Sequence, residues 1–333
     1  MTACDGQEDE PTESVPKVRA WQMVASTNTP QERHEHAYVE VDDAFYLVGG
    51  RGQRPVQKYD PNTQTWENLS APPFQMHHFQ AVGYDGKIYV MGAFTDGYPD
   101  ENPIPNIYIF DPVADTWTAG PEIPADRRRG AAGAVVHNDE FYIVAGIQNG
   151  HTDGHVTWLD KYNPATDTWT QLADAPRARD HFQAVVLDGK LYATAGRRSS
   201  FATNEVFQLT EAAVDVYDIA SDTWTTLPAV ANIPTERAGT AAVALDGKVV
   251  VLGGESGRQI PGMEQSPPPA HTEVEAYNPA TGSWETLPPM LEGRHGTQAI
   301  VYDDAVYIAA GSRTLGGNEI NSHEVFAATA DNE

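Results

Sequence analysis

Arginine recurs at one register of a repeated segment, in a pattern suited to binding an anionic group. Five arginines stand just before the first predicted strand of their segments, and Met76 takes this place in the remaining segment. The five are Arg33, Arg129, Arg179, Arg237 and Arg294. A guanidinium group donates paired hydrogen bonds to a carboxylate, sulfate or phosphate. These residues therefore predict an anion-binding site, provided that the fold brings the segments together.

Histidine and further arginine residues lie close to this register. The next two registers hold His34, His77, Asp180 and His295, then Glu35, His78 and His181, and the following loops add Arg51, Arg54, Arg197, Arg198, Arg258 and Arg313. A repeated residue usually serves the repeat itself, so residues that depart from the pattern are the stronger binding candidates. These are His34, His77, His181, Arg51 and Arg197. For the repeated arginines the alternative is structural, with each paired to a carboxylate of a neighbouring repeat, such as Asp96, Asp153, Glu205 or Glu255.

An internal repeat must position these residues. Six of the seven tryptophans recur at separations of 45 to 60 residues: Trp21, Trp66, Trp117, Trp169, Trp224 and Trp284. Five of them follow an aromatic residue by seven positions, in phrases such as Tyr162-Asn-Pro-Ala-Thr-Asp-Thr-Trp169. An Asx residue followed by proline predicts a turn between two strands. Upstream of this phrase, each unit has a predicted hairpin of two strands joined by a two-residue corner such as Asp85-Gly86. The second strand ends in two small residues such as Gly253-Gly254, called the small pair here.

Four strands in a unit of about 50 residues, with small residues where backbones crowd, are typical of a propeller blade. The small pair, the Tyr/Phe-Asp/Asn-Pro phrase and the tryptophan resemble the kelch repeat from residue 21 to about residue 327. The resemblance implies an all-β fold, a six-bladed kelch β-propeller. The last unit lacks its fourth strand. We therefore expect the N-terminal strand around Trp21 to complete the C-terminal blade, which removes exposed sheet edges.

The lengths of the connections predict which face of the propeller binds. The hairpin corners and the aromatic-to-tryptophan turns are constant, whereas the segments before the first strand and the loops after the second strand vary. Antiparallel strands place both variable sets on one face, and binding residues concentrate on loops held by a rigid scaffold. All arginines except Arg19 and all histidines except His137 fall in these segments or at their edges. In one such loop, Trp158 is a candidate to stack against a sugar ring, with Tyr98 and Phe201 on neighbouring loops, and the alternative is that it anchors its loop.

The overall charge is strongly negative. The chain has 47 acidic and 21 basic residues, for a formal net charge of −26. This balance argues against nucleic acid and anionic membrane surfaces as partners, and it resembles that of proteins adapted to high salt. No apolar run is long enough for a transmembrane segment. The sequence therefore predicts a cationic funnel, suited to a small anion, on an acidic protein.

Cysteine chemistry and cofactors are not expected. Cys4 is the only cysteine, which excludes an internal disulfide, a cysteine zinc site and a thiol within the propeller. A resemblance to galactose-oxidase-like kelch proteins would imply a copper ion beside a crosslinked Tyr–Cys pair. This chain departs from those proteins because its predicted propeller contains no cysteine. Metal candidates are His34 and His36, with His151 and His155, but their spacing singles out no ligand set. We predict neither a metal nor another cofactor.

The two ends differ in composition from the propeller. We assign residues 1–18 to a disordered acidic tail, residues 19–328 to the propeller and residues 329–333 to a C-terminal tail. Small residues before Cys4, followed by a polar stretch, resemble the start of a mature lipoprotein, and an ordinary flexible tail is the alternative. The lipoprotein interpretation favours an extracytoplasmic location, periplasmic or at the cell surface, and the compartment stays open.

We predict a monomeric binding protein that uses its Arg/His-rich face for a small anionic ligand, with an acidic carbohydrate or glycan as the first choice. A second hypothesis is a sugar mutarotase, because six-bladed kelch proteins include the N-acetylneuraminate epimerase. His34, His77, His181 or His295, with Glu35 or Asp180, could exchange protons with an anomeric hydroxyl. No motif singles out catalytic residues. A protein-interaction scaffold is the third hypothesis, because kelch propellers include scaffolds that bind other proteins.

Overall fold

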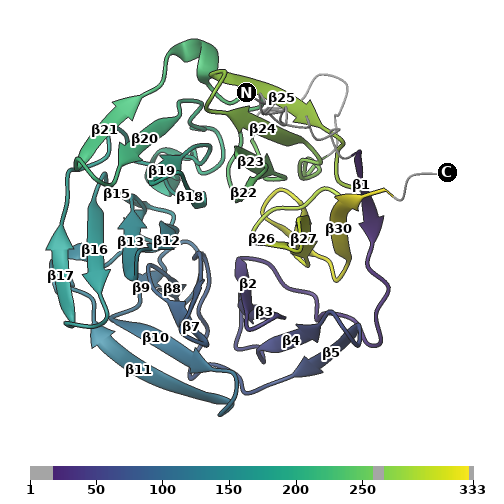
Figure 1. Cartoon of the computed structure of the whole chain (residues 1–333). Coiled ribbons are helices and arrows are strands. Elements are labelled where there is room, and N and C mark those ends of the chain that lie inside the picture. The colour runs from purple at the N-terminus through teal and green to yellow at the C-terminus, as the bar shows by residue number, and fades with distance from the viewer. Residues whose placement is uncertain (1–17, 258–265, 330–333) are drawn as a thin grey trace, which may run out of the picture.

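Six four-stranded antiparallel sheets radiate as blades from a central axis (Figure 1). The computed structural model describes residues 18–257 and 266–329. Residues 1–17 of the predicted N-terminal tail, with Cys4, lie outside the described residues, as do Arg258 and residues 330–333 of the C-terminal tail. The prediction of an all-β, six-bladed propeller is confirmed.

Each blade runs from an inner strand at the axis to an outer strand at the rim. The first two blades are β2 (His36–Val41), β3 (Ala44–Gly49), β4 (Gln57–Asp60), β5 (Thr65–Asn68), and β6 (Val82–Tyr84), β7 (Lys87–Val90), β10 (Asn106–Asp111), β11 (Thr116–Glu122). The next two are β12 (Gly133–His137), β13 (Glu140–Val144), β16 (Leu159–Asn163), β17 (Thr168–Gln171), and β18 (Ala184–Leu187), β19 (Lys190–Ala193), β20 (Asp215–Asp218), β21 (Thr223–Thr226). The last two are β22 (Ala241–Leu245), β23 (Lys248–Leu252), β24 (Val274–Asn278), β25 (Ser283–Leu287), and β26 (Ala299–Tyr302), β27 (Ala305–Ala309), β30 (His323–Ala328), β1 (Arg19–Met23).

Tight corners join the first and second strands of each blade. Both corner residues have positive φ in every blade, for example 50° and 60° at Asp42 and Asp43, and 48° and 68° at Asp85 and Gly86. Two successive positive φ values characterise the type I′ turn, whose twist matches that of paired antiparallel strands. The Asx-rich corners therefore fix the register of each inner hairpin.

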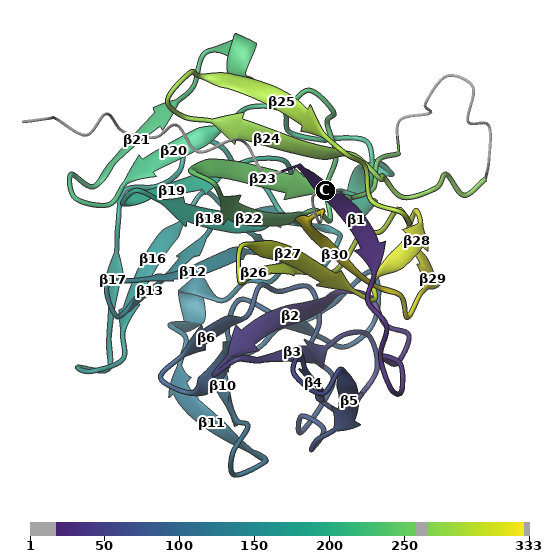
Figure 2. The same ribbon diagram turned by 45° about the vertical axis from the view of Figure 1, so that its right-hand side comes forward.

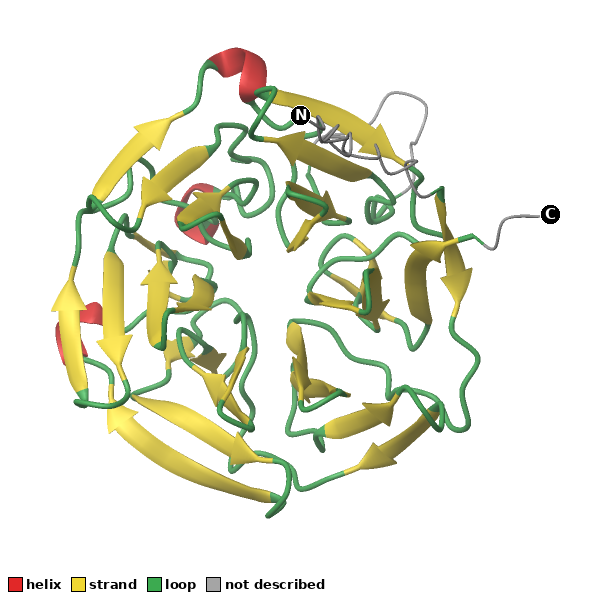
Figure 3. Cartoon of the chain, viewed as in Figure 1, coloured by secondary structure: helices red, strands yellow, loops and turns green. Residues whose placement is uncertain are grey.

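The variable loops carry the remaining regular structure. Loops of three blades form two-stranded hairpins: β8 (Phe94–Thr95) with β9 (Asn102–Pro103), β14 (Ile147–Asn149) with β15 (Asp153–His155), and β28 (Ser312–Thr314) with β29 (Gly317–Glu319). Figure 2 shows β28 and β29 at the right of the view, standing out from their blade. The described chain also has three short 3₁₀ helices (Figure 3): η1 (Ala125–Arg127), η2 (Phe201–Thr203) and η3 (Ala229–Ala231). Within residues 18–257 and 266–329, no helix is long and apolar enough to cross a membrane.

The N-terminal strand lies in the C-terminal blade. Strand β1 pairs with β30 and is the outer strand of that sheet, with Trp21 directly opposite Phe326. The two rings are stacked with their centroids 5.2 Å apart. The other blades show the same cross-strand pair, for example Tyr217 opposite Trp224 with centroids 5.1 Å apart. Trp21 thus occupies the position of the fourth-strand tryptophan of the last unit.

Several fourth-strand tryptophans also connect neighbouring blades. The indole N–H of Trp224 donates to the Ala173 carbonyl of the preceding blade at 2.8 Å. Trp21 donates in the same way to Pro288, which follows β25 of the preceding blade, at 2.9 Å. A buried N–H without a partner is costly. These tryptophans therefore contribute both packing and an interblade hydrogen bond.

Glutamine side chains connect the inner strands across the channel. The Gln80 side-chain oxygen accepts hydrogen bonds from the backbone N–H groups of Ala134 and Ala184, each at 2.9 Å. Its amide group donates to the Ala184 carbonyl at 2.9 Å. Gln298 forms an equivalent pair of bonds with Ala81. These side chains satisfy backbone groups that face the axis, and the cavity that remains there is only about 30 Å³.

We expect Trp21→Ala to destabilise the protein by about 3–5 kcal/mol, the usual cost of truncating a buried aromatic residue. It should also release β1 from β30, because no turn connects β1 to the blade that it completes. Urea unfolding measures the first effect, and hydrogen exchange at residues 19–23 and 323–328 measures the second. Trp224→Ala is the matched control, since its strand stays joined to the third strand by a turn. The same exchange pattern in both variants would contradict this account of ring closure.

Candidate functional site

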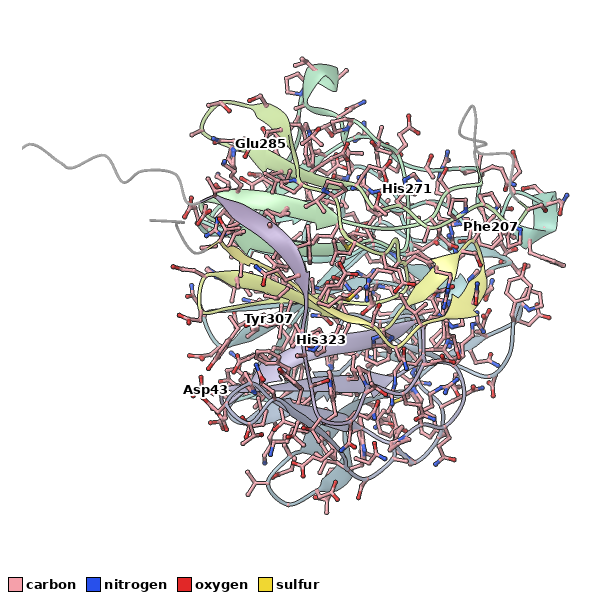
Figure 4. All side chains as sticks on the ribbon, turned by 90° about the vertical axis from the view of Figure 1, so that its right-hand side faces the viewer. Asp43, Phe207, His271, Glu285, Tyr307 and His323 are labelled. Atoms are coloured by element: carbon pink, nitrogen blue, oxygen red, sulfur yellow. The ribbon has the colours of Figure 1, made fainter. Side chains whose placement is uncertain are left out.

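One face of the disc carries the variable segments. In five blades the residue after the arginine register pairs through the backbone with the residue after the small pair. The pairs are His77 with Phe94, Gly130 with Ile147, Asp180 with Arg197, Ala238 with Glu255, and His295 with Ser312. In the remaining blade the N–H of Arg51 donates to the His34 carbonyl at 3.3 Å. Figure 4 shows Phe207 of a variable loop and Asp43 of a hairpin corner at opposite faces.

A ring of backbone hydrogen bonds surrounds the mouth of the channel. The N–H groups donate from one blade to the carbonyl of the one before: His78 to Glu35 at 2.9 Å, Ala131 to His78 at 2.8 Å, His181 to Ala131 at 3.0 Å, Gly239 to His181 at 2.6 Å and Gly296 to Gly239 at 3.0 Å. His36 closes the ring by donating to Gly296 at 3.3 Å. One residue of each blade occupies the same position in this ring and has φ between 51° and 65°: Glu35, His78, Ala131, His181, Gly239 and Gly296. Gly239 and Gly296 adopt this left-handed conformation readily, whereas the ring holds Glu35, His78 and His181 in it.

The five register arginines are buried inside their own blades. None of them is more than 2% exposed. Each donates to the carbonyl of the first residue of the small pair, sixteen positions along the chain: Gly49, Ala145, Ala195, Gly253 and Ala310. Each also donates to a third-strand side chain of the same blade: Gln57, Asp160, Asp215, Glu275 and Glu324. Their hydrogen bonds fasten the small pair to the third strand.

These contacts favour the structural interpretation of the repeated arginines, but with partners that differ from those we expected. The third strand lies in the same sheet and presents a carboxylate, or the Gln57 amide in the first blade, to the guanidinium, so pairing stays within the blade. Of the four carboxylates proposed from the sequence, only Glu255 pairs with an arginine among the described residues. That arginine is Arg197, which lies outside the repeated register.

A pocket of about 460 Å³ opens on the variable face and brings together three of the predicted binding residues, His34, Arg51 and Arg197. Its full lining is His34, Glu35, Arg51, His78, Tyr98, His151, Arg197, Phe207, Glu255 and Gly316. Phe207 is a residue that the sequence analysis missed. It lies in a long loop where no local pattern marks it, and only the fold places its ring 4.8 Å from the Arg197 guanidinium.

Carboxylates accompany the positive charges of the pocket. Arg51 donates to Glu101 at 3.0 Å, and Arg197 donates to Glu255. Burial opposes ionisation of Glu101, but the hydrogen bond from His151 and the charge of Arg51 outweigh it and lower its pKa to about 2. The funnel is therefore mixed in charge rather than purely cationic as predicted, because a buried charge is stable only with a partner. Glu101 was also missed, since its buried position follows from the β8–β9 hairpin.

His295 lies between two carboxylates beside the pocket. Its Nε2 is 3.3 Å from Glu255 Oε2, and its Nδ1 is 3.6 Å from Glu35 Oε1. Burial alone would lower the pKa of His295, but Glu255 and Glu35 outweigh burial and raise this pKa above its usual value. His295 therefore carries positive charge to higher pH than an ordinary histidine.

Three buried histidines from three blades meet beside the pocket. The rings of His78, His151 and His181 have centroid separations of 5.0, 4.9 and 4.7 Å. One ring nitrogen from each lies within 4.8 Å of the other two. Burial lowers the pKa of His78 and of His181, which favours neutral rings. Within the described ranges, this is the group of side chains with the geometry to hold a metal ion.

The other predicted residues lie outside this group. His34 contacts Glu319 at 2.9 Å and His36 contacts Thr297 at 3.0 Å, so this predicted metal pair is not joined to His151. His155 contacts the Ser199 carbonyl at 2.7 Å.

Two further binding candidates do not line the pocket: His77 is buried, and Trp158 is partly exposed. His77 lies behind His78, and its Nε2 contacts the Asp96 carbonyl at 3.0 Å. The ring of Trp158 lies 4.3 Å from the Arg127 guanidinium and 5.6 Å from that of Arg129. These contacts support the alternative that Trp158 anchors its loop.

Comparison with known families agrees with this architecture. A family model described as the Attractin/LZTR1 beta-propeller matches residues 15–263, and a Kelch motif model matches residues 236–291. The chain belongs to the kelch-repeat propellers of the Attractin/LZTR1 beta-propeller family. The suspected kelch relationship is thereby confirmed.

Proteins of several organisms are similar to this chain. Kelch-like protein terF of Aspergillus terreus is 29% identical over 95% of this chain and 70% of its own length. Kelch-like protein 35 of Mus musculus is 28% identical over 57% of this chain and 31% of its own length. Alpha-scruin of Limulus polyphemus is 27% identical over 74% of this chain, which spans only 26% of that relative. A solved structure of YjhT superimposes with a TM-score of 0.74 at 16% identity, covering 92% of this kelch propeller and 98% of that chain, and shows the fold.

We expect Arg294→Ala to destabilise this kelch propeller strongly, by about 3–5 kcal/mol, because it leaves the fully buried Glu324 carboxylate without its guanidinium partner. Urea unfolding measures the loss. Arg198→Ala, at an exposed arginine on the same face, is the control and should change stability by less than about 0.5 kcal/mol. A small effect of Arg294→Ala would show that the register arginines are not structural.

Proposed function

We propose that the pocket on the variable face binds a small acidic carbohydrate. One observation carries the proposal: Arg51 and Arg197 line the same pocket of about 460 Å³ as two carboxylates and two aromatic rings. The volume falls within the range of small-molecule sites, roughly 300–1,000 Å³.

The mixed lining matches the mixed chemistry of an acidic sugar. Arg51 and Arg197 would donate to its acid group, as guanidinium forks do to carboxylates. Glu35 and Glu255 would accept hydrogen bonds from its hydroxyls, and a neutral sugar would offer the arginines no acid group. A bare inorganic anion is a poorer match, because the two glutamates face the same space. Tyr98, 48% exposed, and the nearby Phe207 offer apolar surface to the C–H groups of a sugar ring.

Isothermal titration calorimetry in the presence of EDTA tests the proposal with N-acetylneuraminate, glucuronate, neutral galactose and sulfate. We expect the acidic sugars to bind more tightly than galactose or sulfate. Arg51→Ala should weaken their binding at least tenfold, because it removes a charge-assisted hydrogen bond worth about 1.5–3 kcal/mol. Arg198→Ala should leave it unchanged, since this exposed neighbour does not line the pocket. Equal affinity of the wild type and Arg51→Ala for every ligand would refute the proposal.

A second candidate function is mutarotation of the same ligand, as in the sialic-acid mutarotases that are similar in fold type. It is supported by the adjacent residues His34 and Glu35, which both line the pocket. Burial opposes ionisation of Glu35, but His78 and His295 outweigh it and hold its pKa well below the usual value. Glu35 therefore stays ionised at neutral pH and could accept a proton, and His34 beside it is the candidate for the donor that anomer exchange also needs.

Exchange spectroscopy by NMR on freshly dissolved N-acetylneuraminate tests this second function. Added protein should accelerate anomer exchange, and Glu35→Gln should remove the acceleration because an amide cannot accept the proton. Glu122→Gln, at an exposed carboxylate, serves as control. Binding without acceleration would leave the pocket as a binding site and exclude the mutarotase.

A scaffold for other proteins is the broader function that membership of the kelch propellers supports. Tyr98 and Phe201, each 48% exposed at the variable face, are the aromatic side chains that a protein partner would cover.

A further inference from the structure

We propose that His78, His151 and His181 bind one divalent transition-metal ion at the mouth of the channel. This goes beyond the carbohydrate proposal and does not depend on it. The three rings come from different blades and form a nearly equilateral triangle, with centroids 4.7 to 5.0 Å apart. Their ligand nitrogens lie within 4.8 Å of one another, from where ring rotations can reach the metal–nitrogen distance of about 2.0–2.1 Å.

Hydrogen bonds on the far side of each ring fix the tautomer that a metal requires. His151 Nδ1 lies 3.0 Å from Glu101 Oε2, and His181 Nδ1 contacts Asp180 Oδ1. A carboxylate accepts, so both histidines carry the proton on Nδ1 and leave the Nε2 lone pair free. A carboxylate behind the imidazole is the arrangement that orients metal-binding histidines and raises their basicity.

A relay through His77 gives His78 the same tautomer. His77 Nε2 lies 3.0 Å from the Asp96 carbonyl, which can only accept, so this nitrogen carries the proton. In a neutral ring His77 Nδ1 is then an acceptor, and the His78 Nδ1 that lies 2.6 Å from it must donate. The Nε2 atoms of all three histidines therefore carry lone pairs, and His78 Nε2, which lies 3.4 Å from Arg51 Nη2, would exchange this contact for the ion.

Two features of the backbone and burial point to a ligand rather than to packing. His181 Nε2 is buried and has no hydrogen-bond partner among the described residues, which is an unfavourable state for a polar atom that nothing binds. His78 and His181 also hold left-handed conformations, with φ of 54° and 53°, at ring positions where three other blades carry alanine or glycine. Strain of this kind is retained at functional sites.

The surroundings leave room for a further ligand. His78 lines both the outer pocket and the small inner cavity, so the triad lies where the two meet. Glu35 Oε2 is 3.5 Å from His78 Nε2 and is the carboxylate nearest to the lone pairs by these contacts. Three imidazoles with an open position suit Zn²⁺, Cu²⁺, Ni²⁺ or Fe²⁺ rather than Mg²⁺ or Ca²⁺. An ion here would also add positive charge beside Arg51.

Calorimetric titration of the metal-free full chain with ZnCl₂ tests the proposal, in a Cys4→Ser background so that the thiol cannot bind. We expect one ion per chain. His151→Ala and His181→Ala should each lower the affinity at least tenfold, and Glu101→Gln should lower it roughly 10- to 100-fold through the ring that it orients. His137→Ala, a histidine at a hairpin corner outside the triad, should bind as the parent does.

Folding of each variant is checked by circular dichroism without metal. His151 lies between β14 and β15, so its substitution should be tolerated even where His181→Ala fails to fold. Zn²⁺ should also raise the melting temperature of the parent, and the shift should shrink in Glu101→Gln. Absence of saturable binding by the parent, or equal affinity in the parent and His151→Ala, would overturn the proposal. Because the carbohydrate titrations contain EDTA, failure of one proposal leaves the other intact.

Discussion

The ring of backbone hydrogen bonds at the channel mouth is the constraint on which the binding face depends. It links all six blades and holds one residue of each in a left-handed conformation. A non-glycine residue held in this region costs on the order of 1 kcal/mol or more, so the surrounding sheets must compensate for it. The ring thereby fixes the backbone positions of Glu35, His78 and His181, and so determines which side chains can meet at the axis.

The register and pocket arginines at this face are paired with partner side chains and do not form one cationic patch. The register arginines are used inside the blades, where they connect the small pair to the third strand. The arginines that reach the pocket, Arg51 and Arg197, each have a buried carboxylate partner. Buried charges need such partners because the loss of hydration is large. A very acidic protein can therefore present guanidinium groups to a ligand without creating a cationic surface.

The pocket and the histidine triad share residues, and this gives the two proposals a common physical basis. His78 and His151 line the pocket, and Glu101 contacts both Arg51 and His151. A cation held by the triad would strengthen attraction of an acid group and would compete with Arg51 for Glu101. Charge at one of these positions thus changes the electrostatics of the other, over a distance too short for solvent to screen.

The sequence alone determined the repeat, the six blades and the face on which the loops gather, because these follow from local patterns: Asx corners, small pairs and the aromatic-to-tryptophan spacing. It also selected His34, Arg51 and Arg197, which now line one pocket. It could not decide whether the register arginines are buried in their blades or face a ligand, since a repeated arginine suits either role. Only the tertiary structure joined His78, His151 and His181, because their approach depends on blade curvature and on the β14–β15 hairpin. Contacts between residues 73 and 30 positions apart are set by the closure of the ring, which no short stretch of sequence encodes.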